Sequence, residues 1–271
     1  RMAELLALSP SRANDFVQCP LKFRLRTVDR LPEPPSEAAF RGTLVHAVLE
    51  RLFDVPAPER TLEQAVAGIS PALEALREKD GETVAELFPE PHHVQRLQEQ
   101  ARVLLEGYFS LELPDKVEPA AREQFVQARL DMGLKLRGFV DRTDRAPGGQ
   151  VRLVDYKTGK QPKPQYGREA DFQMRFYALV HWLSDRELVH TLQLFYLGSR
   201  TTVAKRPTAA DVERTEHEIL SLWDEIARAA ETDRWRPRRS PLCGWCHFKP
   251  ICPAWGGTPP PTPEITAIAG R

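Results

Sequence analysis

Two short apolar runs, each followed by an acid, constrain this chain more than any other feature. The first run, in residues 138–141, ends at Asp141. The second ends at Asp155, and Lys157 follows two positions after that acid. Side chains alternate between the two faces of a β-strand, so Asp155 and Lys157 share a face. If the two runs pair in one sheet, both acids can hold one hard divalent cation beside Lys157. This arrangement is suited to metal-assisted hydrolysis of a phosphodiester.

Length and charge narrow the class of protein. The chain has 271 residues, enough for one large domain or two small ones, and Lys+Arg and Asp+Glu are equal at 38. A nucleic-acid binder is often basic, so this balance counts mildly against one, although a nuclease needs only a local basic channel. Local basic runs occur at residues 234–239 and at Lys22, Arg24, Arg26 and Arg30. A solvated charged surface explains each run equally well.

The sequence indicates where the chain is expected to act. It contains no apolar run long enough to span a membrane, and no signal peptide is apparent. We therefore expect a cytoplasmic location and no membrane partner. In that compartment, four cysteines favour metal binding over disulfides.

The pattern of apolar residues predicts an α/β or α+β fold with a central mixed sheet flanked by helices. Ser9 followed by Pro10 predicts a helix start. Residues 1–255 are expected to form one domain, residues 54–92 a helical insertion, and the proline-rich residues 256–271 a disordered tail. The expected helices are 10–19, 40–53, 93–109, 169–183 and 209–230, and the expected strands are 123–130, 134–141, 151–157 and 192–197, with a short partner near Val203.

Three residues on the predicted helices could complete the site. His46 lies in the 40–53 helix, while Gln173 and Tyr177 are four residues apart and share a helix face. An imidazole beside carboxylates favours manganese over pure magnesium. Ordinary roles compete with these assignments: an Asp-x-Lys sequence is commonly a surface ion pair, His46 could pack in the core, and Asp144 competes for the role of Asp141.

Taken together, the motifs resemble the RecB-type branch of the PD-(D/E)XK nucleases. They are residues 42–46 (Gly-Thr-Leu-Val-His), 138–142 (Gly-Phe-Val-Asp-Arg), 155–159 (Asp-Tyr-Lys-Thr-Gly) and the Gln173…Tyr177 pair. The resemblance implies a restriction-endonuclease-like core. Glu123 matches the family pattern less securely and is left out of the implied set. The implied metal ligands are His46, Asp141, Asp155 and the carbonyl of Tyr156, and the implied catalytic residues are Asp141, Asp155 and Lys157, supported by Gln173 and Tyr177.

The four cysteines form a second pattern, with Cys19 far upstream of Cys243, Cys246 and Cys252. Thiolates bind zinc or iron–sulfur clusters, but zinc sites usually consist of two close pairs. The resemblance sharpens this choice, because AddB nuclease domains and CRISPR adaptation nucleases have one cysteine before the nuclease core and three after it. It implies a 4Fe–4S cluster that ties the N-terminal helix to the C-terminal cysteine loop. Nearby aromatic residues such as Trp245 could shield that cluster or stack on a base.

The resemblance implies a metal-dependent DNA nuclease, with Mn²⁺ or Mg²⁺ as the ion. Single-stranded DNA ends are the implied substrate, and an exonuclease in DNA repair or recombination is the implied role. The sequence has no phosphate-binding loop of the motor type, so any helicase would be a separate partner. Three alternatives stay open: a DNA-binding subunit of a helicase–nuclease complex that does not cut, a CRISPR spacer-acquisition nuclease, and a zinc-stapled hydrolase of another ester.

Overall fold

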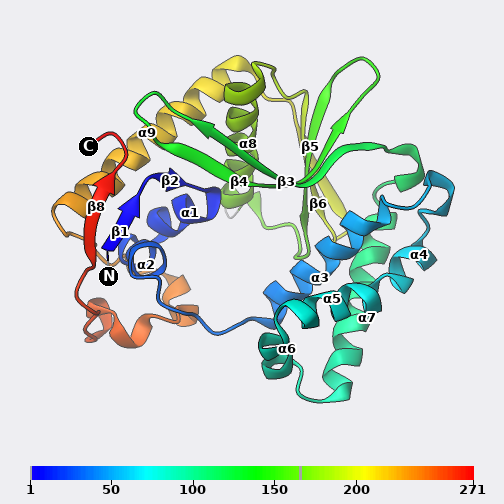
Figure 1. The fold of residues 1–271 in the computed structure, drawn as a ribbon, viewed down its shortest axis with the longest axis horizontal. Helices are drawn as coiled ribbons and strands as arrows, with labels where there is room; N and C mark the ends of the chain where they lie inside the picture. The colour runs from blue at the N-terminus through cyan, green and yellow to red at the C-terminus, as the bar shows by residue number, and fades with distance from the viewer. Residues whose placement is uncertain (1, 165–166) are drawn as a thin grey trace.

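The computed structural model of the chain describes residues 2–164 and 167–271 (Figure 1). Within this range, six strands form one mixed sheet in the order β2-β4-β5-β6-β7, with β3 also paired to β4. Helices flank this sheet, which confirms the predicted α/β class with a central mixed sheet. The strands are β2 (Ala7–Leu8), β3 (Pro119–Arg129), β4 (Lys135–Arg145), β5 (Val151–Lys157), β6 (Thr191–Tyr196) and β7 (Thr201–Lys205).

The helices begin where side chains can cap them. At the first helix, Ser9 Oγ accepts a hydrogen bond from the backbone nitrogen of Arg12, and Pro10 occupies the first turn, as predicted. The α-helices are α1 (Pro10–Gln18), α2 (Pro20–Phe23), α3 (Glu37–Leu52), α4 (Leu62–Ala67), α5 (Ile69–Lys79), α6 (Gly81–Leu87), α7 (Pro91–Phe109), α8 (Arg168–Asp185) and α9 (Ala209–Glu231). A π-helical turn follows α2 (Arg24–Val28), and short 3-10 turns lie at Ala57–Glu59, Pro114–Lys116, Pro241–Trp245, Lys249–Ile251 and Pro253–Trp255.

Strand β5 is buried on both of its faces. Val151 and Leu153 pack into a core with α1, α8 and α9, whereas Val154 and Tyr156 pack into a second core with α3, α5 and α7. Residues on the two faces of β5 thus pack into two different apolar cores, which explains the nearly continuous apolar sequence of this strand. Figure 1 shows α8 and α9 beside one part of the sheet, and α3 to α7 gathered beside another. None of the helices in the described ranges is both long and apolar enough to cross a bilayer.

Strand β4 has an interrupted edge, and this interruption creates the site. Along one edge β4 pairs with β3 over nearly its whole length. Along the other edge it pairs in parallel with β2 at Lys135 and Leu136, then antiparallel with β5 from Arg142 onward. In the part of the chain that the structure describes, residues 137–141 have no strand partner on that edge. The backbone therefore opens into a cleft between β2 and β5.

The C-terminal segment differs from its prediction. Residues 256–271 were expected to be disordered, but β8 (Glu264–Ile268) pairs in parallel with β1 (Met2–Leu5). In addition, Trp223 Nε1 donates a hydrogen bond of 3.0 Å to the carbonyl of Ala269. The prolines of this segment suggested disorder, but the Ile-Thr-Ala-Ile run that follows them contains β-branched residues, which favour a strand.

Candidate active site

Asp141 and β5 meet where β4 and β5 diverge. Asp141 Oδ2 accepts a hydrogen bond of 2.7 Å from the backbone nitrogen of Tyr156, so a carboxylate replaces the missing ladder partner. Asp141 was expected at the end of its strand, but β4 continues to Arg145. The acid therefore lies within the strand, at the point where its free edge begins.

His46 from α3 joins Asp141 and Glu123 in one compact group. One ligand atom from each of the three residues lies within 4.8 Å of the others. His46 Nδ1 is 3.5 Å from Glu123 Oε1 and 3.5 Å from Asp141 Oδ1. The other ring nitrogen, Nε2, lies 2.9 Å from the carbonyl oxygen of Tyr156. Because a carbonyl only accepts hydrogen bonds, Nε2 must donate, and this bond orients Nδ1 toward the two carboxylates.

Glu123 is the site residue that the sequence analysis set aside. Its neighbours Arg122 and Gln124 pair with Arg142 and Val140, so Glu123 lies opposite Asp141 in the β3–β4 ladder. Its φ of 41° falls in the left-handed region, which non-glycine residues rarely adopt and which is common at functional sites. The loop between β3 and β4 is the sequence signal that could have identified Glu123 as a site residue.

That loop is short and contains a glycine. Gly133, with a φ of 90°, lies in the connection between Leu130 and Leu134, and the backbone nitrogen of Leu130 donates to the carbonyl of Leu134. A three-residue loop with glycine in the left-handed conformation is a common hairpin turn. Counting back from the Leu130–Leu134 pair places Glu123 opposite Asp141.

Asp155, Lys157 and Gln173 form a closed hydrogen-bonded triangle beside that group. Lys157 Nζ donates to Gln173 Oε1 at 2.7 Å and to Asp155 Oδ1 at 3.1 Å, and Gln173 Nε2 donates to Asp155 Oδ1 at 2.7 Å. Asp155 Oδ2 is buried and lies 2.8 Å from Lys157 Nζ, so the ammonium lies against both oxygens of this carboxylate.

Tyr177, one turn after Gln173 on α8, lies against Gly138. A Cβ at position 138 would lie 2.7 Å from the Tyr177 ring, so only glycine allows α8 to approach β4 this closely. Burial and the nearby charge of Asp155 raise the pKa of Tyr177 to about 12, so its hydroxyl stays protonated. The structure thus groups His46 and Asp141 with Glu123, and it groups Asp155 with Lys157 and Gln173.

Negative charge is concentrated at this point. Burial, followed by the charge of Asp141, raises the pKa of Asp155 above its ordinary range. Burial alone would lower the pKa of His46, but hydrogen bonds to Asp141 and Glu123 outweigh it and raise that pKa to about 10. The carboxylates therefore favour a positive charge between them. The two carboxylates of Asp141 and Glu123 and the imidazole of His46 fit a divalent cation of the manganese or magnesium type.

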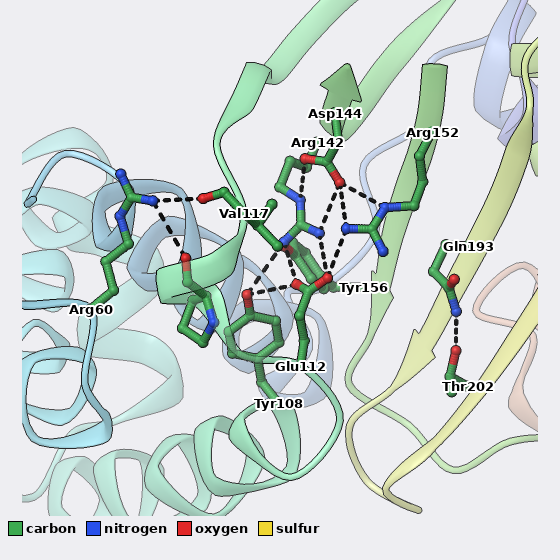
Figure 2. A network of polar contacts seen from close by, with 11 residues as sticks. Arg60, Tyr108, Glu112, Val117, Arg142, Asp144, Arg152, Tyr156, Gln193 and Thr202 are labelled. Carbon is green, nitrogen blue, oxygen red and sulfur yellow. Dashed lines mark hydrogen bonds and ion pairs between the residues drawn. The ribbon is translucent and has the colours of Figure 1, made fainter. Parts of the chain in front are cut away.

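On the opposite face of β4 and β5, a buried network of ion pairs joins the two strands (Figure 2). Arg142 is 1% exposed and donates to Tyr156 OH at 2.6 Å and to Glu112 Oε2 at 2.7 Å. It also contacts Asp144, which pairs with Arg152 as well. Asp144 is therefore committed to this network and does not compete with Asp141. Because Arg142 and Tyr156 each follow a site aspartate directly, the network fixes β4 against β5 at the site.

The four cysteines surround a second cavity, of about 320 Å³, between the start of α2 and the C-terminal turns. All four are free. Backbone N–H groups of Arg238 and Ser240 donate to Cys19 Sγ and Cys243 Sγ, each at 3.4 Å. Within the described ranges, no three of these sulfurs lie within 4.8 Å of one another.

Comparison with known proteins places this geometry in a family. The model of the PD-(D/E)XK nuclease superfamily matches residues 7–253. The Gene 69 proteins of Mycobacterium phages L5 and D29 are each 24% identical to this chain, over 292 and 269 residues, covering 91% of it and 96% of each phage protein. A crystal structure from Eubacterium rectale, of a protein provisionally named an exonuclease, has a TM-score of 0.56 at 14% identity, covering 90% of this chain and 88% of that one. That likeness concerns the fold alone, whereas the family model spans most of the sequence. The chain belongs to the PD-(D/E)XK nuclease superfamily.

Proposed function

We propose that this protein is a metal-dependent deoxyribonuclease that hydrolyses phosphodiester bonds. The observation that carries the proposal is the convergence of His46, Glu123 and Asp141 beside the Asp155–Lys157 pair. The first three residues, together with Asp155 and the carbonyl of Tyr156, would hold Mn²⁺ or Mg²⁺. When bound, such an ion polarises the phosphoryl oxygen and lowers the pKa of bound water.

The side chains of this protein have separate tasks in that proposal. Asp155 and Gln173 hold the ammonium of Lys157 in one position, with the Lys157 side chain 30% exposed at the cleft. From there the ammonium can offset the negative charge that develops on the phosphate in the transition state. Gln173 contacts both other residues and so positions them relative to each other.

An exonuclease acting on single-stranded DNA ends, in repair or recombination, is the finer form of the proposal. Its support is the RecB-type resemblance and the fold shared with a protein named as an exonuclease. The test is digestion of end-labelled linear and circular single-stranded DNA with Mn²⁺, using wild type and Asp155→Ala. We expect wild type to degrade linear DNA and spare circles. Cleavage of circles would refute the end requirement, and cleavage of neither by wild type would favour a DNA-holding subunit of a helicase complex.

Glu123 gives a prediction specific to the metal site. Glu123→Gln should weaken Mn²⁺ binding by about tenfold or more, because it removes one of two charges facing His46. Isothermal titration of Mn²⁺ into the metal-free protein measures this affinity. Glu213→Gln, an exposed change on α9, is the matched control and should leave the affinity at the wild-type value. An unchanged affinity in Glu123→Gln would remove this residue from the site.

We further propose that Cys19, Cys243, Cys246 and Cys252 bind a 4Fe–4S cluster, which places the protein in the iron–sulfur subset of RecB-type nucleases. The four cysteines line one cavity although Cys19 is more than 220 residues from the others. A cluster there would tie α1 and α2 to the C-terminal turns. Anaerobic purification followed by iron, sulfide and zinc analysis tests this assignment directly, and stoichiometric zinc without sulfide would contradict it.

Loss of one cysteine should destabilise the whole domain, since the free energy of metal binding also stabilises the fold. We expect Cys19→Ser to lose most iron and sulfide and to melt about 10 °C or more below wild type, a change of about 3 kcal/mol. The control is Val17→Ser, which changes an exposed residue two positions earlier on α1. Scanning calorimetry of anaerobic samples measures both variants. Equal melting temperatures for Cys19→Ser and wild type would rule out the structural role.

A further inference from the structure

One exposed face of the β3–β4 hairpin has three successive cross-strand pairs of different chemistry. Glu123 lies opposite Asp141, Phe125 pairs with Phe139, and Gln127 pairs with Arg137. Residues two apart on a strand share a face, so carboxylates, aromatic rings and a guanidinium follow one another along the ladder. Neighbouring pairs are about 7 Å apart, twice the rise per residue of a strand.

The aromatic pair is exposed next to the proposed metal site. The ring centroids of Phe125 and Phe139 lie 5.3 Å apart, and these residues are 49% and 56% exposed. A cross-strand aromatic pair supports a sheet by itself, but this one leaves half of its surface open to solvent. Phe139 borders both the cavity of about 960 Å³ that contains Lys157 and the cavity of about 490 Å³ that contains His46 and Glu123. The Phe139 ring therefore lies between the two halves of the site.

Unneutralised positive charge lies beside the rings. Arg12 of α1 and Arg137 of β4 line the same large cavity as Phe125 and Phe139. Burial, followed by the charges of Arg137 and Arg30, lowers the pKa of Arg12, so these guanidinium groups lie close enough to repel one another. Among the described residues, none of the three arginines forms an ion pair with a carboxylate. Such a cluster favours an anionic ligand, and phosphate fits it best.

We infer that the Phe125–Phe139 pair is a base-stacking platform, and that Arg12 and Arg137 bind the adjoining phosphate. The ligand is single-stranded DNA with an unstacked base at this position. Bases in a regular duplex are paired and stacked on one another, so only an unpaired base can stack on these rings. Arg137 lies on one side of the rings and Asp141 on the other, so a strand whose base stacks on the rings would run from the arginines toward the proposed metal site. This inference rests on the proposed nuclease function and assigns its choice of substrate.

The test compares leucine and tyrosine at both positions. Phe125→Leu/Phe139→Leu keeps apolar side chains on the ladder but removes the aromatic faces, whereas Phe125→Tyr/Phe139→Tyr keeps them. Fluorescence anisotropy with labelled oligodeoxythymidylate in EDTA measures binding without cleavage. We expect the leucine variant to bind single strands about tenfold or more weakly, and the tyrosine variant to bind like wild type. Binding of a duplex of the same length should change little in either variant. With Mn²⁺, the leucine variant should show a raised KM and a nearly unchanged kcat.

A second measurement uses the wild-type protein alone. An abasic nucleotide placed at each position of the oligonucleotide in turn should weaken binding at one position, and the leucine variant should be insensitive there. Trp245→Leu removes an aromatic residue that is 82% exposed in the cysteine region and should change nothing. If Trp245→Leu causes the loss instead, the platform lies there.

The outcomes separate this inference from the proposed function. Wild-type affinity in the leucine variant, or an equal loss for duplex and single strand, would overturn the platform even if wild type cuts DNA. If wild type shows the abasic effect but no cleavage with Mn²⁺, the nuclease proposal fails and the platform stands. A flat abasic scan in wild type overturns the platform regardless of how the variants fold.

Discussion

Lys157→Ala is expected to lower kcat by about 10²–10³-fold while single-stranded DNA binding stays close to wild type. The loss follows from removing one fixed positive group from a site where negative charge develops. Asp155 and Gln173 hold this ammonium within 3.1 Å, so its position is fixed before substrate arrives. Rapid-quench measurement of single-turnover cleavage with Mn²⁺ isolates the chemical step from product release.

Two comparisons make the result specific to Lys157. Lys116→Ala removes a lysine whose side chain is 73% exposed, and it should cut DNA at the wild-type rate. Mn²⁺ affinity of Lys157→Ala should stay the same or increase, because a positive charge near the ion is lost. A single-turnover rate within a few-fold of wild type would exclude Lys157 from the mechanism.

The second large effect concerns stability. Arg142→Met should reduce the free energy of unfolding by about 3–5 kcal/mol, because among the described residues it leaves the buried Glu112 and Asp144 with Arg152 as their one cationic partner. The corresponding fall in melting temperature is roughly 10 °C. Arg145→Met changes an arginine on the same strand whose side chain is 47% exposed, and it should cost no more than about 1 kcal/mol. Urea unfolding of wild type and the two variants measures their free energies of unfolding. Equal losses in the two variants would show that burial of the network does not increase its contribution to stability.

The pH dependence of this difference has a defined sign. Burial would raise the pKa of Glu112, but its hydrogen bond and charge interaction with Arg142 and the charge of Arg152 lower it overall from 4.5. A carboxyl group with a depressed pKa in the folded state stabilises the protein above its unfolded-state pKa, and this contribution is lost as pH falls. The stability gap between wild type and Arg142→Met should therefore be constant above about pH 4.5 and narrow below it.

The predictions for Lys157 and Arg142 concern opposite faces of the paired strands β4 and β5. Asp155 and Lys157 face the cleft, while Tyr156 between them faces the network and accepts a hydrogen bond from Arg142. Loss of Arg142 therefore also loosens the residue whose backbone contacts Asp141 and His46. We expect Arg142→Met to lower nuclease activity at temperatures where it is still folded, by less than Lys157→Ala does.

Local patterns in the sequence determined much of this protein. The Ser9–Pro10 start of α1, the bounds of β5 at Val151–Lys157, and the shared face of Asp155 and Lys157 were all predicted correctly. These features depend on residues close together in the chain, because capping and side-chain alternation act over a few positions. The four-residue spacing of Gln173 and Tyr177 on α8 belongs to the same class.

Tertiary structure decided what depends on long-range pairing. Only the separate partners of β4, which lie far apart in the sequence, open its edge at residues 137–141. The pairing of β8 with β1 likewise joins the two ends of the chain, which no local pattern indicated. The physical reason is that strand partners are chosen by burial and backbone hydrogen bonding between distant segments, and a short window of sequence contains neither partner.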